Sequence, residues 1–205
     1  MNSPTEIDAS LQAVASDIRK LDPDGARTAR VLRETLDQLY DGQRTGRYRP
    51  DQLYKTEKTH CGTLVEINLQ REFKFQDGID LDYQIAGVDV DCKFSQTLNG
   101  WMIPPEARRK LCLVVWAEDT ATPHWSMGLF RVTDDRLNNG SNRDAKSTLN
   151  AAGRKAIVWL FQERPLPSNV LLQLDRPTVD RIMSLKSGQK RINELFRMAL
   201  CRIVS

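Results

Sequence analysis

The chain has 205 residues, of which 40% are hydrophobic and 28% are charged, and its formal net charge is +3. A chain of this size and composition can bury the core of one medium domain and is typical of a folded protein. No apolar run is long enough to cross a bilayer. The polar start Met1–Ser10 also lacks a signal-peptide pattern, so we expect a cytoplasmic protein.

Few soft metal ligands are present. The four cysteines form no Cys-x-x-Cys pair, and the two histidines, His60 and His124, are far apart in the chain. A zinc site needs three or four such ligands at workable spacing, so none is expected. Any metal would instead be held by carboxylates, whose oxygen atoms favour magnesium or a similar hard cation.

Helical periodicity dominates the first third of the chain. Apolar residues recur at helical spacing in 11–21 and again in 31–39, and turn residues end each of these stretches. A polar and basic loop is expected at 42–50. A third helix is predicted from about Thr63 to Phe73.

Strand patterns follow. Leu81–Ile85 is a short run before the turn residues Ala86-Gly87, and Val88–Ser95 alternates strictly between apolar and polar residues. Leu111–Ala117 is almost continuously apolar, which is typical of a central strand covered on both faces. Trp125–Val132 is a further candidate strand.

The last part of the chain is predicted to be mainly helical. Ser147–Gln162 indicates a helix, Val170–Leu174 a strand, and 178–184 and 191–204 two more helices. Residues 141–205 include twelve basic and five acidic residues, an excess that fits either a polyanionic partner or a solvated helical surface. Strands mixed with covering helices argue for the α/β class.

The residues around Asp82 and Asp91-Cys92-Lys93 could carry chemistry. Side chains two apart on a strand share a face, so Asp91 and Lys93 project together while Cys92 points into the core. The turn before this strand can bring Asp82 beside Asp91. Two carboxylates can hold a metal that lowers the pKa of a bound water, and Lys93 can orient that water or take its proton. Glu66, on the preceding helix, could complete the ligand set or hold a second ion.

A plainer interpretation stays open. Gathering Glu66, Asp82, Asp89 and Asp91 in one place is costly without a cation, which favours a metal site. An Asp-x-Lys tripeptide is nevertheless a weak signal that a solvated strand face also produces. Asp89 either supports the site or belongs to the polar surface. A second tripeptide, Asp144-Ala145-Lys146, lies in a polar loop and is interpreted as structural or DNA-contacting.

Longer stretches resemble the NaeI restriction endonuclease family. They cover nearly the whole chain: Thr35–Arg47, Lys55–His60, Gly62–Asn68, Asp82–Ser95, Trp101–Glu106, Leu111–Ala117 and Asn142–Asp144. The resemblance implies an α/β restriction-endonuclease-like (PD-(D/E)xK) fold, a mixed sheet flanked by helices that is similar to the mismatch-repair nuclease MutH. It also implies that Glu66, Asp82 and Asp91 bind Mg2+ and that Lys93 serves the attacking water.

The activity implied by the resemblance is that of a type II restriction endonuclease. Such an enzyme would hydrolyse double-stranded DNA at a specific, GC-rich palindromic site as a homodimer with Mg2+. Basic residues are expected to contact the DNA, mainly at its phosphates: Arg44, Arg47, Arg49, Lys55, Lys58, Arg143 and Lys146. The alternatives are a catalytically silent or effector-dependent DNA-binding homologue, and a monomeric nicking endonuclease.

The resemblance further implies two domains. Residues 1–164 would form the endonuclease domain, and 165–205 a linker and the incomplete start of a second domain of the helix-turn-helix type. Family members bind a second copy of their DNA site as an effector, which we expect here only with a full C-terminal domain. Leu39-Tyr-Asp-Gly42 resembles the nucleotidyl-lysine motif of DNA ligases, but leucine replaces the lysine, so no strand-rejoining activity is expected.

Overall fold

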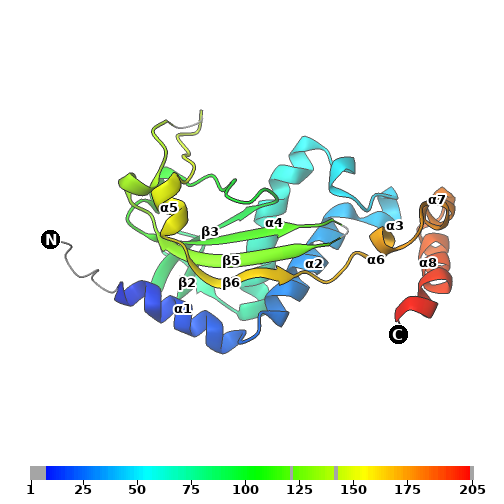
Figure 1. The fold of residues 1–205 in the computed structure, drawn as a ribbon, viewed down its shortest axis with the longest axis horizontal. Helices are drawn as coiled ribbons and strands as arrows, with labels where there is room; N and C mark the ends of the chain where they lie inside the picture. Colours follow the sequence, from blue (N-terminus) through cyan, green and yellow to red (C-terminus); the bar gives the residue numbers. More distant parts are fainter. Residues whose placement is uncertain (1–7, 121, 141–142, 204–205) are drawn as a thin grey trace.

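A mixed β-sheet forms the centre of the molecule (Figure 1). The computed structural model describes residues 8–120, 122–140 and 143–203. Within these residues the sheet has six strands, which neighbour one another in chain order: β1 (Gln76–Asp77), β2 (Tyr83–Ile85), β3 (Val88–Ser95), β4 (Leu111–Glu118), β5 (His124–Arg131) and β6 (Val158–Pro165). Each pair is antiparallel except β3 and β4, which run parallel.

Helices cover the sheet and extend beyond one of its ends. In the described part of the chain they are α1 (Ala9–Leu21), α2 (Ala26–Tyr40), α3 (Gly42–Thr45), α4 (Lys55–Phe73), α5 (Ala151–Lys155), α6 (Val170–Gln173), α7 (Arg176–Ser184) and α8 (Gly188–Ile203). Short 3-10 turns lie at Pro50–Gln52, Pro105–Ala107 and Asp134–Arg136. Helix α2 packs on α4, α4 on β3 and α1 on β5.

The first two helices form where the periodicity predicts them. Leu11, Val14 and Ile18 are buried along one face of α1, and Leu32 and Leu36 are fully buried on α2. These faces bury apolar area, that of α1 against β5 and that of α2 against α4, and such burial is the main source of stability for a helix of this length. The two N-terminal helices of the prediction are therefore confirmed.

The strand β4 has apolar layers on both sides. Leu113 and Val115 lie in the larger core with α1, α2 and α4, while Cys112 and Val114 lie in a second core with Trp101. Alternation along a strand sends neighbouring side chains to opposite faces, so a strand covered on both faces has a continuous apolar sequence. The prediction for this segment is confirmed.

The β2–β3 hairpin places two acidic residues opposite each other. Its turn residues Ala86 and Gly87 both have positive φ, at 50° and 75°, as a two-residue hairpin turn requires. The register pairs Tyr83 with Val90, so Asp82, the residue before β2, stands opposite Asp91.

Four segment predictions need correction. The loop expected at 42–50 begins with one helical turn, α3. Ser147–Gln162 is not one helix, because only α5 is helical and the β-branched and aromatic run from Val158 to Phe161 pairs with β5. Val170–Leu174 is not a strand, because the Asn169 side chain caps a short helix by accepting a hydrogen bond from the Leu171 backbone N–H at 3.1 Å. Helix α4 begins at Lys55, earlier than predicted.

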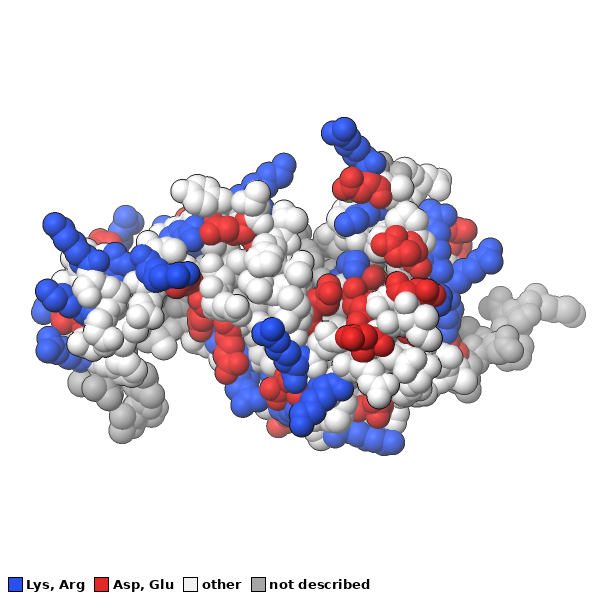
Figure 2. Space-filling view, turned by 180° about the vertical axis from the view of Figure 1, so that it is seen from behind, with Lys and Arg blue, Asp and Glu red and all other residues white. Residues whose placement is uncertain are grey.

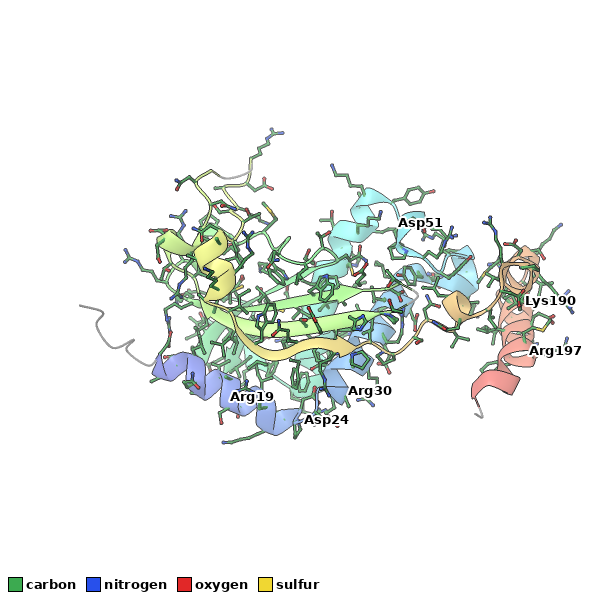
Figure 3. All side chains as sticks on the ribbon, viewed as in Figure 1. Arg19, Asp24, Arg30, Asp51, Lys190 and Arg197 are labelled. Carbon is green, nitrogen blue, oxygen red and sulfur yellow. The ribbon has the colours of Figure 1, made fainter. Side chains whose placement is uncertain are left out.

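The predicted fold class is confirmed, since a mixed sheet is flanked by helices. None of the described helices is both long and apolar enough to cross a membrane. Helices α7 and α8 lie at the end of the molecule opposite the start of α1 (Figure 1). Figure 3 shows Lys190 and Arg197 on the outer side of α8, away from the sheet.

Candidate active site

Lys93 joins two carboxylates on the β2–β3 hairpin. Its Nζ lies 2.7 Å from Asp91 Oδ1 and 3.3 Å from Asp82 Oδ2. It also donates a hydrogen bond to the carbonyl oxygen of Cys92 at 2.8 Å. The structure therefore brings together the three residues that strand geometry predicted to meet.

Further hydrogen bonds fix each carboxylate. Asp82 Oδ2 accepts one from the backbone N–H of Cys92 at 2.7 Å, across the hairpin. Asp91 is 3% exposed, and its Oδ2 accepts a weak hydrogen bond from the Cys112 thiol at 3.5 Å. Cys112 is the register partner of Asp91 on the parallel strand β4. The two acids are thus held by the sheet itself.

Burial and mutual repulsion act on the acids. Burial is the main cause that raises the pKa of Asp91 to about 6, although attraction to Lys93 opposes the shift. Burial, followed by the negative charge of Asp82, also raises the pKa of Glu66 to about 6. Burial disfavours the charged form of Lys93, but attraction to Asp91 and Asp82 outweighs it and raises the pKa of Lys93. The site therefore combines three carboxylates with one strongly held ammonium group.

A cleft of about 550 Å³ opens beside Lys93. Glu66 on α4 lines it from one side, and the Tyr83 hydroxyl donates to the Glu66 carbonyl oxygen at 2.7 Å, which ties α4 to β2. Asp144 and Lys146 also line the cleft, so the second Asp-x-Lys tripeptide lies near the first. The cleft brings Glu66 and Lys93 together with a loop that is distant in the sequence.

Figure 2 shows acidic side chains gathered on the rear face of the molecule, with Lys and Arg side chains around them.

The donor set has the chemistry of a site for a hard divalent cation. Asp82 and Asp91 offer carboxylate oxygens and already share one cationic group, the Lys93 ammonium. Among the described residues, however, no three His, Cys, Asp or Glu side chains converge as a metal site. Glu66 therefore stands beside the Asp82–Asp91 pair without forming one ligand group with it.

The predicted DNA-contacting residues separate into two sets. Lys58 and Lys146 line the cleft beside Lys93, while Lys55 and Arg143 are exposed on the same helix and loop. Asn142, which belongs to the motif around Arg143, lies outside the described residues.

The second set lies away from the cleft and pairs with acidic neighbours. Arg44 and Arg47 line a different pocket, of about 590 Å³, between α2–α3 and the terminal helices. The set forms three ion pairs: Arg47 binds Glu57 through both terminal nitrogens at 2.6 and 2.7 Å, Arg44 binds Asp41 at 2.7 Å, and Arg49 binds Asp51 at 3.2 Å.

Asp89 supports the site through the backbone. Its carboxylate accepts hydrogen bonds from the N–H groups of Ile79 at 2.8 Å and Asp80 at 3.0 Å. These residues belong to the loop that leads into Asp82. At Gly78 in the same loop, a Cβ would lie 2.2 Å from the carbonyl oxygen of Leu81, so the loop needs glycine there. Of the two interpretations of Asp89, the supporting one agrees with these contacts.

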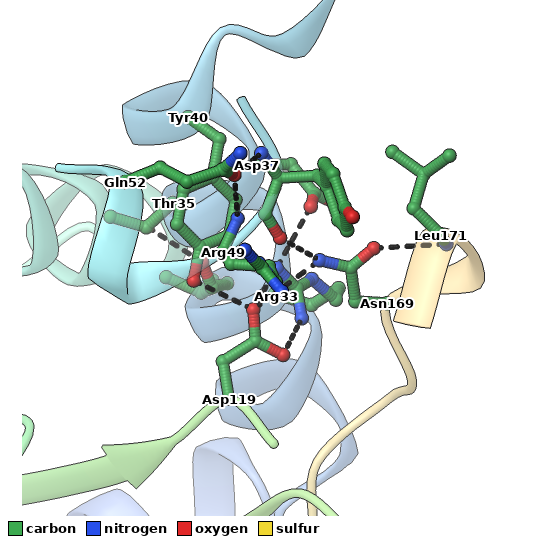
Figure 4. A network of polar contacts seen from close by, with 11 residues as sticks. Arg33, Thr35, Asp37, Tyr40, Arg49, Gln52, Asp119, Asn169 and Leu171 are labelled. Carbon is green, nitrogen blue, oxygen red and sulfur yellow. Dashed lines mark hydrogen bonds and ion pairs between the residues drawn. The ribbon is translucent and has the colours of Figure 1, made fainter. Parts of the chain in front are cut away.

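A buried polar network was missed by the sequence analysis (Figure 4). Arg33 on α2 binds both carboxylate oxygens of Asp119, at 2.7 and 3.1 Å, and the Tyr40 hydroxyl donates to Asp119 at 2.8 Å. Asn169 donates to the carbonyl oxygen of Tyr48 at 2.8 Å and to Asp119 at 3.5 Å. The only local signal was an arginine on the apolar face of α2 and an acid directly after a buried strand.

Other residues that could have carried chemistry lie in the core or at the surface. Cys92 is buried and its thiol pKa is raised by burial, which leaves it neutral and unsuited to attack. His60 and His124 are exposed. Trp101 and Trp125 are fully buried core residues.

Comparison with known proteins assigns the chain to a family. A family model described as Restriction endonuclease NaeI matches residues 12–205. The chain belongs to the restriction endonuclease NaeI family. A relative in this family, the Type II restriction enzyme NaeI of Lentzea aerocolonigenes, is 52% identical over 206 aligned residues, which cover 97% of this chain. The chain spans 64% of the length of that relative.

Proposed function

We propose that the chain acts as a type II restriction endonuclease that hydrolyses phosphodiester bonds at a specific site in double-stranded DNA. The observation that carries the proposal is the Asp82–Lys93–Asp91 cluster, which adjoins a cleft lined by Glu66 in a member of the NaeI family. A GC-rich palindromic site and Mg2+ as the metal belong to the same proposal.

Asp82 and Asp91 would hold the metal, with Glu66 as a third carboxylate. A bound Mg2+ supplies polarisation of the phosphate and lowers the pKa of water. Asp82 and Asp91 are already held by backbone and thiol hydrogen bonds, so the sheet would orient both carboxylates before DNA arrives.

Lys93 would orient the attacking water and support charge on the phosphate. Its three N–H groups all donate in this structure, to Asp82, Asp91 and the Cys92 carbonyl. An ammonium group has no lone pair with which to take a proton, so it favours orienting the water, to which it would donate once a metal has replaced it at the carboxylate oxygens. It also lines the cleft where a phosphate can reach it.

Two basic side chains would guide the DNA into the cleft. Lys58 on α4 and Lys146 on the opposite loop line it, and phosphate contacts by lysine do not depend on sequence. Lys55 and Arg143 would extend this surface. Arg44, Arg47 and Arg49 would contact DNA only if they exchanged their acidic partners for phosphates.

The quaternary and domain organisation extends the same proposal. Two copies would cut the two strands of a palindrome, so we propose a homodimer. Residues 1–164 would form the endonuclease domain and 165–205 a linker and the start of a second domain. The cytoplasmic location stays a prediction.

A plasmid digestion tests the function. Plasmid rich in GC palindromes is incubated with the protein and Mg2+, with EDTA in place of the metal, and with the Lys93→Ala variant. Discrete fragments that need Mg2+ and vanish in the variant support the proposal. Open circles without linear DNA would indicate a monomeric nicking enzyme, and a salt-sensitive gel shift without products would indicate a DNA-binding homologue.

A further inference from the structure

Gly62 lies in the middle of α4 without a structural reason to be glycine. A glycine inside a helix destabilises it relative to alanine, because the backbone loses more freedom on folding. An added Cβ at Gly62 would meet nothing within 4 Å, and the backbone there is helical rather than left-handed. The fold therefore tolerates a side chain at this position.

The other glycines of the chain differ from Gly62 in this respect. Each of them either has a positive φ or would place a Cβ within 3 Å of another atom. Gly153 shows the second case, because its Cβ would lie 2.2 Å from the Arg136 carbonyl oxygen. Gly62 alone among the eleven glycines, all of which the structure describes, has neither constraint.

Gly62 faces the cleft beside the catalytic cluster. Helix α4 buries Cys61, Val65 and Leu69 against the core, which leaves a neighbouring face toward the cleft. On that face Gly62 lies one turn before Glu66, and both line the cleft with Lys93. Thr59 and Thr63 also line the cleft from α4, so Gly62 leaves a gap between side chains on the helix surface that leads to Glu66.

We propose that Gly62 is the point where one sugar–phosphate strand of the DNA approaches the α4 backbone most closely. The inference rests on the proposed function, because it assumes that DNA occupies this cleft. Lys58 and Lys146 supply positive charge at the walls, and the absent side chain lets the strand lie deep enough to reach Lys93. Glycine is the residue used where a backbone must approach a ligand closely.

Two substitutions separate this role from a structural one. Gly62→Ala adds one methyl group and Gly62→Leu a long side chain, both in open space. Ala13→Leu is the matched control, because Ala13 is exposed on α1, outside the cleft. For each protein we would measure the melting temperature, the affinity for a 30-base-pair duplex at several salt concentrations in EDTA, and plasmid cleavage with Mg2+.

We expect Gly62→Ala to stabilise the fold and Gly62→Leu to weaken DNA binding and cleavage. Gly62→Ala should raise the melting temperature by about 2–4 °C, the shift that about 1 kcal/mol gives in a chain of this size. Gly62→Leu should weaken duplex binding and lower kcat/KM for cleavage about 100-fold, as a misplacement of about 1 Å can. For Gly62→Leu the slope of log affinity against log salt concentration should become less steep by about 1, the value expected for the loss of one phosphate contact. Ala13→Leu should bind and cleave like the wild type.

Other outcomes overturn the inference in distinguishable ways. Wild-type binding and cleavage by Gly62→Leu would mean that DNA does not approach this residue, while the proposed function would stand. A lower melting temperature in Gly62→Ala would show that the fold needs glycine there. A wild-type chain that neither binds nor cleaves duplex DNA would overturn the inference together with the proposed function.

Discussion

Lys93 acts as an internal counter-ion for two acids. Its ammonium group stands between Asp82 and Asp91, at 3.3 and 2.7 Å, and its side chain is 22% exposed. A metal ion that binds these carboxylates competes with this group for the same oxygens. Removal of the ammonium charge should therefore strengthen metal binding while it weakens catalysis.

A Lys93→Met variant tests this competition. Without the ammonium group, Asp82 and Asp91 repel each other, so the metal-free variant should melt at a lower temperature than the wild type. Added Mg2+ should raise its melting temperature more than it raises that of the wild type, because a ligand stabilises the state that binds it. Thermal melts over a Mg2+ titration provide the measurement.

The control for this prediction is Lys58→Met, which removes a positive charge from the same cleft without touching either aspartate. Its response to Mg2+ should match that of the wild type. An equal response of Lys93→Met and Lys58→Met to Mg2+ would contradict the competition between lysine and metal.

At the scale of elements, the loop before β2 determines where Asp82 lies. Asp89 on β3 binds two N–H groups of this loop, and Lys110 Nζ lies 3.4 Å from Asp80 on its outer side. The loop has little apolar contact of its own, and Ile79 is 80% exposed. Its shape therefore depends on the Asp89 carboxylate.

Loss of Asp89 should reduce cleavage through the position of Asp82. Asp89→Ala frees the loop, and a displacement of about 1 Å at a reacting group can cost about 100-fold in rate. We expect a lower kcat with a nearly unchanged KM for plasmid DNA, measured under steady-state conditions. Asp80→Ala, which removes only the exposed partner of Lys110, should keep at least half of the rate. Equal losses in the two variants would argue against a positioning role for Asp89.

The β2–β3 hairpin was predictable from sequence because the alternation and the turn residues that specify it lie within one short segment. Strict alternation over Val88–Ser95 and the Ala86-Gly87 turn fix the face and the register of β3, and these place Asp91 and Lys93 together. The segment 147–162 failed because Leu149, Ile157 and Leu160 fit a helical period, while pairing with β5 selects a strand instead. The β-branched and aromatic residues of Val158–Phe161 were a local sign of this strand, but the helical spacing of the longer segment outweighed it in the prediction.

At the scale of the whole molecule, the Asp119 network links segments far apart in sequence. Arg33 and Asp119 are 86 residues apart, and Asn169 is 50 residues further along the chain. No local pattern marks such partners, which is why the sequence analysis did not find them. The network connects helix α2 and the end of β4 to the segment that leads into the terminal helices (Figure 4).

Loss of one buried partner should destabilise the molecule strongly. Asp119→Ala leaves the Arg33 guanidinium, 9% exposed, without its main counter-ion, and breaking such a pair costs about 3–5 kcal/mol. Asp37→Ala removes the other acid on Arg33, but Asp37 is 57% exposed, so its loss should cost only about 0–1 kcal/mol. Urea denaturation of both variants measures the difference, and similar costs would show that the buried pair contributes little.

The position of the proposed catalytic residues in the chain has a consequence for folding. Glu66, Asp82, Asp91 and Lys93 all lie within residues 66–93, on a helix and the hairpin that follows it. Contacts between residues close in sequence lose little chain entropy when they form, and a topology rich in them folds fast. The parallel pairing of β3 with β4 instead needs the connecting segment 96–110 to fold back along the sheet. The addition of β6 to the edge of the sheet needs residues 158–165, which lie far along the chain. We therefore expect the helix and hairpin that carry the acids to assemble early and the outer strands to dock onto them later.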